Sequence, residues 1–356
     1  MMRQMRRILV AVGDVDHAPR KELRKAGALA KASGASVELF HAIDAPDPGR
    51  RYPETATLAT VESERAAMVA RAEARLERFA RDPSLQGVKV TFTAVWDRPA
   101  YDAISRRALA TKADLVIAAS RGHRFGGRLV LRNTDWELIR HCAAPLLLVK
   151  SPQQYRKPVV MTAVDPFHAH AKPANLDIQL LAAANRFARL LKGTPHLFHA
   201  YMPLPVVETV PCSGPVLEVY DPELEAAHGK QVAQVINKMG ERAGITRAHR
   251  HIAMGDVASQ LSALTRRTRS SIVVMGAVSR SALTRFFIGN TAEHVLDRLT
   301  CDVLIVKPRG FRSVMTRKSA SRTSRRPRAA GAPMLAASPE PASTVTAARF
   351  VLPPLL

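Results

Sequence analysis

The chain has 356 residues and a mass of 38.9 kDa, a length that predicts two domains of ordinary size. Hydrophobic residues make up 47% and charged residues 23%, which excludes a chain that is disordered throughout. The formal net charge is +23, so nucleic acids and anionic membranes are candidate partners. A general richness in arginine and alanine also explains this charge, and we favour that explanation for the body of the protein.

The three cysteines, Cys142, Cys212 and Cys301, lie far apart in the chain. No CxxC pair exists, which excludes a zinc ribbon and a thioredoxin-type redox pair, and the scattered odd count fits a reducing compartment. The apolar run Ile8–Val12 is too short for a signal peptide, and no stretch reaches the ~18 apolar residues of a membrane span. We therefore expect a soluble, cytoplasmic protein.

The sequence contains two copies of one unit. The segment LFHA at residues 39–42 recurs at residues 197–200, and Asn133-Thr134 recurs as Asn290-Thr291. Similar short matches keep the same order along the whole of both copies, which is hard to obtain by chance. We therefore predict a tandem duplication.

Strand-like and helix-like patterns alternate in the first copy. The β-branched and apolar runs predict strands at residues 8–12, 37–42, 88–95, 114–119 and 145–149. Helical periodicity predicts helices at residues 19–31, 61–80 and 134–141, and one more helix that Asp97 caps.

The second copy repeats this order, with an opening strand at Val160–Val164 and a helical stripe from Leu176 to Leu191. Continuous apolar strands alternating with helices indicate parallel sheets with helices on both faces. The predicted fold class is therefore α/β, with two tandem, doubly wound, Rossmann-like domains of about five strands each. The expected boundaries are residues 1–151 for the first domain and 156–309 for the second.

Residues 311–356 form a tail rich in Arg, Ser, Pro and Ala, with Glu340 as its one acid. The tail has no periodic apolar face, so we expect it to be disordered. Its charges could contact nucleic acid or an anionic surface, or the tail could be a solvated extension. We favour the second interpretation.

The best candidate for chemistry follows the strand Ile272–Met275. Gly276 is followed by Ser279, and after nine more residues by Gly289, Asn290 and Thr291. Glycines let backbone amides approach a phosphate, and the capping-box pattern from Asn290 to Glu293 starts a helix whose N-terminus favours an anion. A tight turn that needs glycine for its shape alone explains the spacing equally well.

Histidines offer weaker candidates. His168 and His170 lie after the opening strand of the second copy, but without a third ligand a metal site there is disfavoured. His41 and His199 occupy the same place in the two copies and are expected to be buried and structural. We assign His249 and His251 to one solvated strand face, and Trp96 and Trp136 to the edge of the core.

Residues 275–308 resemble the nucleotide-loop-to-last-strand segment of universal stress proteins. The family pattern is Gly, two residues, Gly, nine residues, Gly and then Ser or Thr. This chain keeps that spacing and two of the three glycines, with Ser279 at the second glycine and Asn290 before Thr291. The opening TAVDP, with Asp165 at its end, also resembles the family. The tandem arrangement resembles the two-domain members, and the resemblance spans about residues 6 to 308.

The resemblance implies an adenine-nucleotide-binding fold of the α-hydrolase-like type. Carried over to this chain, it implies that ATP, with any metal being Mg²⁺ bound to the nucleotide, is held by residues at the ends of the second copy's strands. Around adenosine these are Asp165, Ala200 and Met275, and around the phosphates Gly276, Ser279, Gly289, Asn290 and Thr291. It also implies pairing through last strands, here Leu146–Val149 with Val303–Val306, as a pseudo-dimer within one chain, and a possible homo-oligomer.

The first copy departs from this pattern. Gly13 stands where Asp165 stands in the second copy, Ala119 replaces the first glycine and Arg132 the last one, while Gly122 remains. A side chain at position 132 would crowd a phosphate, so we expect the first copy not to bind nucleotide in this way.

Three functional interpretations stay open. The first is a non-enzymatic stress-response protein with at most one ATP site, in the second copy. The second is a slow ATP hydrolase, which lacks an evident general base; the GxSxG, GxxxxGK[ST] and HExxH motifs are also absent. The third is a nucleotide-independent adaptor that contacts nucleic acid or anionic surfaces through the tail. We favour the first.

Overall fold

The computed structural model describes most of both copies. The described residues are 4–44, 57–120, 123–125, 128–130, 133–167, 175–203, 206–208, 217–219, 222–276, 290–311 and 328–329. Residues 277–289, which contain most of the predicted nucleotide loop, lie outside them.

The first half of the chain contains five strands of the main sheet, as the repeat pattern predicts. Its elements are β1 (Arg7–Ala11), α1 (Arg20–Ser33), β2 (Ser36–Ile43), α3 (Leu58–Ala80), the 3-10 helix η1 (Pro83–Leu85), β3 (Val90–Trp96), α4 (Ala100–Ala110), β4 (Leu115–Ala119), the short strands β5 (His123–Phe125) and β6 (Arg128–Val130), α5 (Asn133–His141) and β7 (Leu146–Val149).

The second half repeats this order, with β8, β9, β12, β13 and β14 in the main sheet. Its elements are β8 (Val159–Ala163), α6 (Leu176–Leu190), β9 (Thr194–Tyr201), β10 (Val206–Glu208), β11 (Leu217–Val219), α7 (Pro222–Arg242), the 3-10 helix η3 (Arg247–His249), β12 (Arg250–Met254), α8 (Val257–Arg267), β13 (Ile272–Gly276), α9 (Asn290–Arg298) and β14 (Asp302–Val306). The short strand β15 (Arg328–Ala329) follows in the tail.

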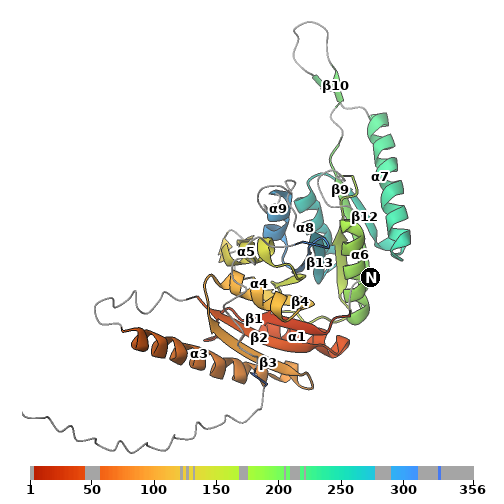
Figure 1. The fold of residues 1–356 in the computed structure, drawn as a ribbon. Coiled ribbons are helices and arrows are strands. Elements are labelled where there is room, and N and C mark those ends of the chain that lie inside the picture. Colours follow the sequence, from red (N-terminus) through yellow and green to blue (C-terminus); the bar gives the residue numbers. More distant parts are fainter. Residues whose placement is uncertain are drawn as a thin grey trace, which may run out of the picture.

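Eleven strands of the described residues form one sheet in the order β12-β9-β8-β13-β14-β7-β4-β1-β2-β3-β15. In this main sheet the strands within each half pair in parallel, whereas β14 pairs antiparallel with β7 at the centre, with Leu304 opposite Leu147; the short pairs β5–β6 and β10–β11 are separate and antiparallel. The two halves therefore share one continuous sheet (Figure 1). In the tail, β15 pairs antiparallel with the edge strand β3.

Side chains alternate between the two faces of this sheet, as the period of a strand requires. One hydrophobic core packs Ile8, Leu39 and Val160 against α1, α3 and α6, and a second packs Leu9, Phe40 and Phe198 against α4, α5, α8 and α9. A third, smaller core includes Leu197 of β9 and buried residues of α7. Both faces are covered, which accounts for the continuous apolar runs in the sequence.

One expected helix cap is wrong. The Asp97 carboxylate does not cap α4; it pairs instead with Arg106 Nη2 at 2.6 Å, while Pro99 precedes the helix. Asp256, which precedes α8 in the second half, does accept a hydrogen bond from the backbone N–H of Ser259 at 2.8 Å. The two halves thus begin corresponding helices with different local chemistry.

A buried ion pair joins the halves. Lys25 on α1 lies 3.0 Å from the Asp302 carboxylate at the start of β14, and the two side chains are 2% and 0% exposed. Asp302 also accepts hydrogen bonds from the Tyr155 hydroxyl at 2.7 Å and from the backbone N–H groups of Lys150 and Ser151. The Lys25 ammonium also bonds the Gln153 carbonyl and lies 3.8 Å from the Tyr155 ring centroid. The carboxylate therefore holds the connecting segment against both halves.

The histidines divide into confirmed and corrected predictions. His41 and His199 are buried, and Trp96 and Trp136 are partly buried at the edges of the cores, as expected. His249 and His251 do not share a strand face exposed to water, because η3 interrupts the strand before β12. Both rings stack against buried His196, at centroid distances of 4.2 and 5.1 Å.

In the described part of the chain, no helix combines the length and apolar character needed to cross a bilayer.

Candidate functional site

The carboxyl ends of three adjacent strands bring together four of the predicted site residues. Asp165 lies just beyond the end of β8, Ala200 lies near the end of β9, and Met275 and Gly276 are the last residues of β13. The strand order β9-β8-β13 and the parallel register place these ends at one edge of the sheet. This is the edge at which doubly wound sheets bind ligands.

Asp165 is held where the chain turns from β8 towards α6. The residue is half-buried, and its backbone N–H donates to the Asp177 carboxylate at 3.3 Å, in the first turn of α6. Asp177 is itself buried, so it fixes the path of the loop rather than facing solvent. This hydrogen bond fixes the backbone of Asp165 beside the carboxyl end of β8.

A histidine supports this edge in each half. The Nδ1 atom of His199 lies 3.0 Å from the Val164 carbonyl, and that of His41 lies 2.7 Å from the Val12 carbonyl. Because a carbonyl oxygen only accepts, Nδ1 carries the proton in both rings. His199 also packs against the ring of Phe167 at 5.4 Å. These contacts tie the end of one strand to its neighbour.

Gly276 has a structural reason to be glycine. A Cβ atom at this position would lie 2.9 Å from a terminal methyl group of Leu176 on α6. Close packing of strand and helix therefore accounts for this glycine without any ligand. The first half has Ala119 at the corresponding position.

The helix α9 begins at Asn290, at the position where the capping-box pattern starts. Thr291 is exposed in the first turn, and Glu293 follows in the same turn. Ser279 and Gly289 lie outside the described residues, as do Gly122, Arg132, His168 and His170, and the side chain of Asn290 is not described.

Ion pairs cross the corresponding edge of the first half. Arg75 on α3 reaches the Asp16 carboxylate at 2.7 Å, and Arg98 reaches Asp44, just after β2, at 2.7 Å. Asp14, next to Gly13, accepts the backbone N–H of Asp16 and contacts the His17 ring. Two of the carboxylates at this edge, those of Asp16 and Asp44, are thus held in ion pairs within the first half.

Sequence reasoning missed Asp177 and Arg75. Asp177 contacts the backbone of Asp165, and Arg75 contacts Asp16, so both join segments that are separated in the sequence. A single sequence carries no periodic signal for such contacts. At this edge the second half offers the ends of three strands, the residue Asp165 and the N-terminus of α9, a set of groups that can contact a polar ligand and an anion. Among the described residues, no group of three or more His, Cys, Asp or Glu side chains is arranged to hold a metal ion.

The fold defines a tandem α/β protein whose two doubly wound halves share one sheet. The sequence profile of the universal stress protein family matches the chain twice, over residues 5–150 and 175–307. The chain belongs to the universal stress protein family, and the predicted resemblance is confirmed.

Curated relatives include universal stress protein E of Photorhabdus laumondii subsp. laumondii. The chain is 26% identical to it over 309 residues, which cover 85% of this chain and 95% of the relative. Universal stress protein E of Escherichia coli strain K12 is 27% identical over 225 residues, covering 62% of this chain and 69% of the relative.

Solved structures support the tandem α/β fold. A putative universal stress protein from Pseudomonas aeruginosa UCBPP-PA14 matches 85% of this chain and 94% of its own, with a TM-score of 0.64 and 21% identity. A universal stress protein from Archaeoglobus fulgidus DSM 4304 matches 85% of this chain and 99% of its own, with a TM-score of 0.54 and 14% identity.

Proposed function

We propose that this chain is a non-enzymatic stress-response protein that binds one adenine nucleotide, ATP, at the strand edge of its second half. The observation that carries the proposal is the difference between the two halves at this edge. The second half presents Asp165, Ala200 and Gly276 on adjacent strand ends, whereas the first half presents ion-paired Asp16 and Asp44. Binding of the nucleotide would change the surface at this edge of the sheet without making or breaking a covalent bond.

Each group has a role in the proposed site. The Asp165 carboxylate accepts hydrogen bonds from the nucleoside, and the backbone around Ala200 and Met275 borders the base. The backbone from Gly276 to Ser279 and from Gly289 to Thr291 holds the phosphates, helped by the N-terminus of α9. A Mg²⁺ ion would be bound by the nucleotide's phosphates rather than by a cluster of protein side chains.

Nucleotide stoichiometry tests the proposal. The purified chain is denatured to measure released adenine nucleotide, and the stripped protein is titrated with ATP and Mg²⁺ by calorimetry. We expect about one ATP per chain, with binding lost in Asp165→Ala and in Gly289→Arg. The matched control is Asp14→Ala at the edge of the first half, which should bind ATP as the parent does.

Two outcomes would contradict the proposal. An absence of binding at millimolar ATP would leave a nucleotide-independent adaptor as the better interpretation. Steady release of phosphate from ATP that Gly289→Arg abolishes would establish a slow hydrolase instead of a non-enzymatic protein.

A further inference from the structure

The amino ends of the strands in the second half carry a dense set of exposed cations. Four adjacent strands, in the order β12-β9-β8-β13, are each preceded by basic residues. We define the amino-end basic surface as the exposed side chains Lys157, Lys192, Arg247, Arg266, Arg267 and Arg269. This surface lies at the opposite end of the strands from the proposed nucleotide site.

Three of these cations adopt a backbone conformation that normally favours glycine. Lys157, Lys192 and Arg269 have φ angles of 46°, 53° and 51°, in the left-handed region. The first half has Gly34, with a φ of 71°, at the position that corresponds to Lys192, two residues before the next strand. A cation therefore stands at this turn although it carries a conformational cost that glycine avoids.

The second half also lacks acids that the first half places at the same positions. Asp114, immediately before β4, accepts the backbone N–H groups of Arg6 and Arg7, and its counterpart before β13 is Ser271. Glu38 precedes the LFHA segment in the first half, and His196 precedes it in the second. Both replacements remove negative charge from the amino end.

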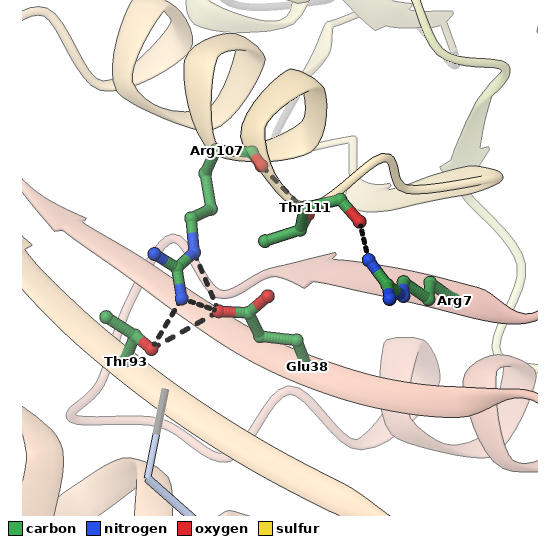
Figure 2. Close-up of polar contacts among 5 residues, drawn as sticks. All are labelled: Arg7, Glu38, Thr93, Arg107 and Thr111. Atoms are coloured by element: carbon green, nitrogen blue, oxygen red, sulfur yellow. Dashed lines mark hydrogen bonds and ion pairs between the residues drawn. The ribbon is translucent and has the colours of Figure 1, made fainter. Parts of the chain in front are cut away.

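Figure 2 shows how the first half uses its acid there. Glu38 on β2 pairs with Arg107 on α4 at 2.6 Å, and Thr93 on β3 bonds both side chains. Arg7 donates to the Thr111 carbonyl beside this pair. At the amino end of the first half, charged side chains therefore pair with one another. In the second half, Leu264 stands at the position that corresponds to Arg107.

Charge in the second half is segregated along the strand direction. The acids Glu223, Asp256 and Glu293 lie in the first turns or caps of α7, α8 and α9, at the carboxyl end, where Arg298 pairs with Asp256 at 3.1 Å. Near the amino end, Glu241 pairs with Arg250 at 3.2 Å. A general excess of arginine does not produce this separation, because composition alone spreads charge over the whole surface.

Helix dipoles explain only part of the pattern. Arg266 and Arg267 end α8, where cations stabilise the last turn. Lys192 directly follows the C-cap of α6, and Arg269 that of α8, so the same explanation extends to them; only Lys157 and Arg247 lie away from the C-terminus of an α-helix. Their placement points to a ligand rather than to helix stability.

We propose that the amino-end basic surface binds the sugar-phosphate backbone of a nucleic acid duplex. Four neighbouring strands span three spacings of about 4.8 Å, or about 14 Å, and about eight phosphates of a duplex lie within that length of its axis. The large hydrophobic side chains that the described residues expose, such as Leu58, Phe167 and Met254, lie elsewhere, so this surface offers no side chain for insertion into a membrane. It also offers no exposed aromatic ring for stacking on bases, which favours contacts that are independent of sequence.

The test measures binding of the full chain to a fluorescent DNA duplex of about 20 base pairs by anisotropy at several salt concentrations. The main variant is Lys157→Gly, Lys192→Gly and Arg269→Gly combined, because glycine accepts the positive φ angles and should leave the melting temperature unchanged or higher. We expect at least about tenfold weaker binding at low salt and a salt dependence reduced by up to about 2.7 in log–log slope, from about 0.9 per lost phosphate contact.

Two controls separate this surface from the rest of the chain. Lys112→Gly removes a cation with a φ of 52° from the amino end of the first half and should leave the salt dependence unchanged. A tail variant with Arg322→Gln, Arg325→Gln and Arg326→Gln isolates the tail, and the triple glycine change should still weaken binding in that background.

Four results would overturn the proposal. The first is a parent chain that binds no duplex at low salt. The second is an unchanged affinity in the triple glycine variant. The third is a loss in Lys112→Gly as large as one third of the triple effect. The fourth is binding to phosphatidylserine vesicles, but not to the duplex, that the triple change abolishes.

Discussion

Replacing Asp302 with asparagine should lower the free energy of unfolding and weaken the cooperativity between the two halves. The change keeps the size of the side chain but removes the charge opposite the Lys25 ammonium, which is 2% exposed and bonds the carboxylate at 3.0 Å. It also places an amide N–H₂ where four donors converge, namely Lys25 Nζ, the Tyr155 hydroxyl and the N–H groups of Lys150 and Ser151. Breaking a buried pair by removing one partner costs about 3 to 5 kcal/mol, and we expect a loss in this range.

Urea unfolding followed with two probes measures this effect. Both tryptophans, Trp96 and Trp136, lie in the first half, so their fluorescence reports on that half while far-UV circular dichroism reports on both. The parent chain should give coincident transitions, and Asp302→Asn should give transitions that separate, because α1 and β14 are no longer joined by the pair. The control is Glu77→Gln in the exposed pair with Arg81, which should change the free energy of unfolding by no more than about 0.5 kcal/mol.

A double variant decides whether the pair itself is responsible. Lys25→Met should cost less in the Asp302→Asn background than in the parent chain, because the buried ammonium already lacks its counter-charge there. A cost for Asp302→Asn below about 1 kcal/mol would refute the reasoning. Equal costs for Lys25→Met in both backgrounds would refute it as well.

Three further predictions follow from single side chains. Burial, with His249 and His251 beside it, lowers the pKa of His196 from 6.5 to about 4, so the free energy of unfolding should fall as the pH falls from 6.5 to 4. His196→Phe should remove up to about 3 kcal/mol of that loss. Urea unfolding at several pH values measures it, and an unchanged dependence of stability on pH would contradict it. Gly276→Ala should cost no more than about 1.5 kcal/mol, because the added Cβ meets the terminal methyl group of Leu176, which can move by a change of rotamer; a larger loss in thermal melting would contradict this. Asp256→Ala should cost about 1 kcal/mol of stability in thermal melting, because it removes the cap of α8. Asp82→Ala removes the corresponding side-chain hydrogen bond at the 3-10 helix η1 and serves as the comparison.

The order of strands and helices was predictable because it rests on local patterns that occur twice. The helix α3 spans Leu58–Ala80 and buries Ala72 and Leu76, as the period of its apolar residues requires. The expected role of Asp97 was wrong because the guanidinium group of Arg106, within α4, provides a stronger partner for its carboxylate. An ion pair with an arginine of the helix is stronger than a hydrogen bond to a backbone N–H at the helix N-terminus. The sequence alone does not show which of these two contacts forms.

The candidate site was predictable only where topology determines it. Once the strands were assigned, the rule for doubly wound sheets placed Asp165, Ala200 and Met275 at one edge. The interpretation of Gly276 depended on a helix packed across the sheet, since Leu176 comes from α6. No spacing along the chain encodes that contact, so the sequence could not separate a phosphate-binding glycine from a packing glycine.

The stacking of His249 and His251 against His196 was missed for a related reason. The residues alternate as strand neighbours do, but η3 turns the chain just before β12 and places His249 outside the strand. His196 comes from β9, at the position where the first half has Glu38. Only the comparison of corresponding positions in the two halves shows that an ion-paired site has been replaced by an imidazole cluster.

The same comparison suggests how the two halves divide their roles. In the first half, ion pairs form within the fold at both ends of the strands, through Arg75 with Asp16 and Arg107 with Glu38. In the second half, exposed cations at the amino end outnumber the acids there, so this end keeps a positive charge available to an anionic ligand, whereas at the carboxyl end Arg298 pairs with Asp256. A nucleotide at one end and a nucleic acid at the other would then share the four strands β12, β9, β8 and β13. If the strands transmit strain between these ends, ATP should change the affinity for duplex, and the duplex must change the affinity for ATP by the same factor, because the coupling between two binding equilibria is reciprocal.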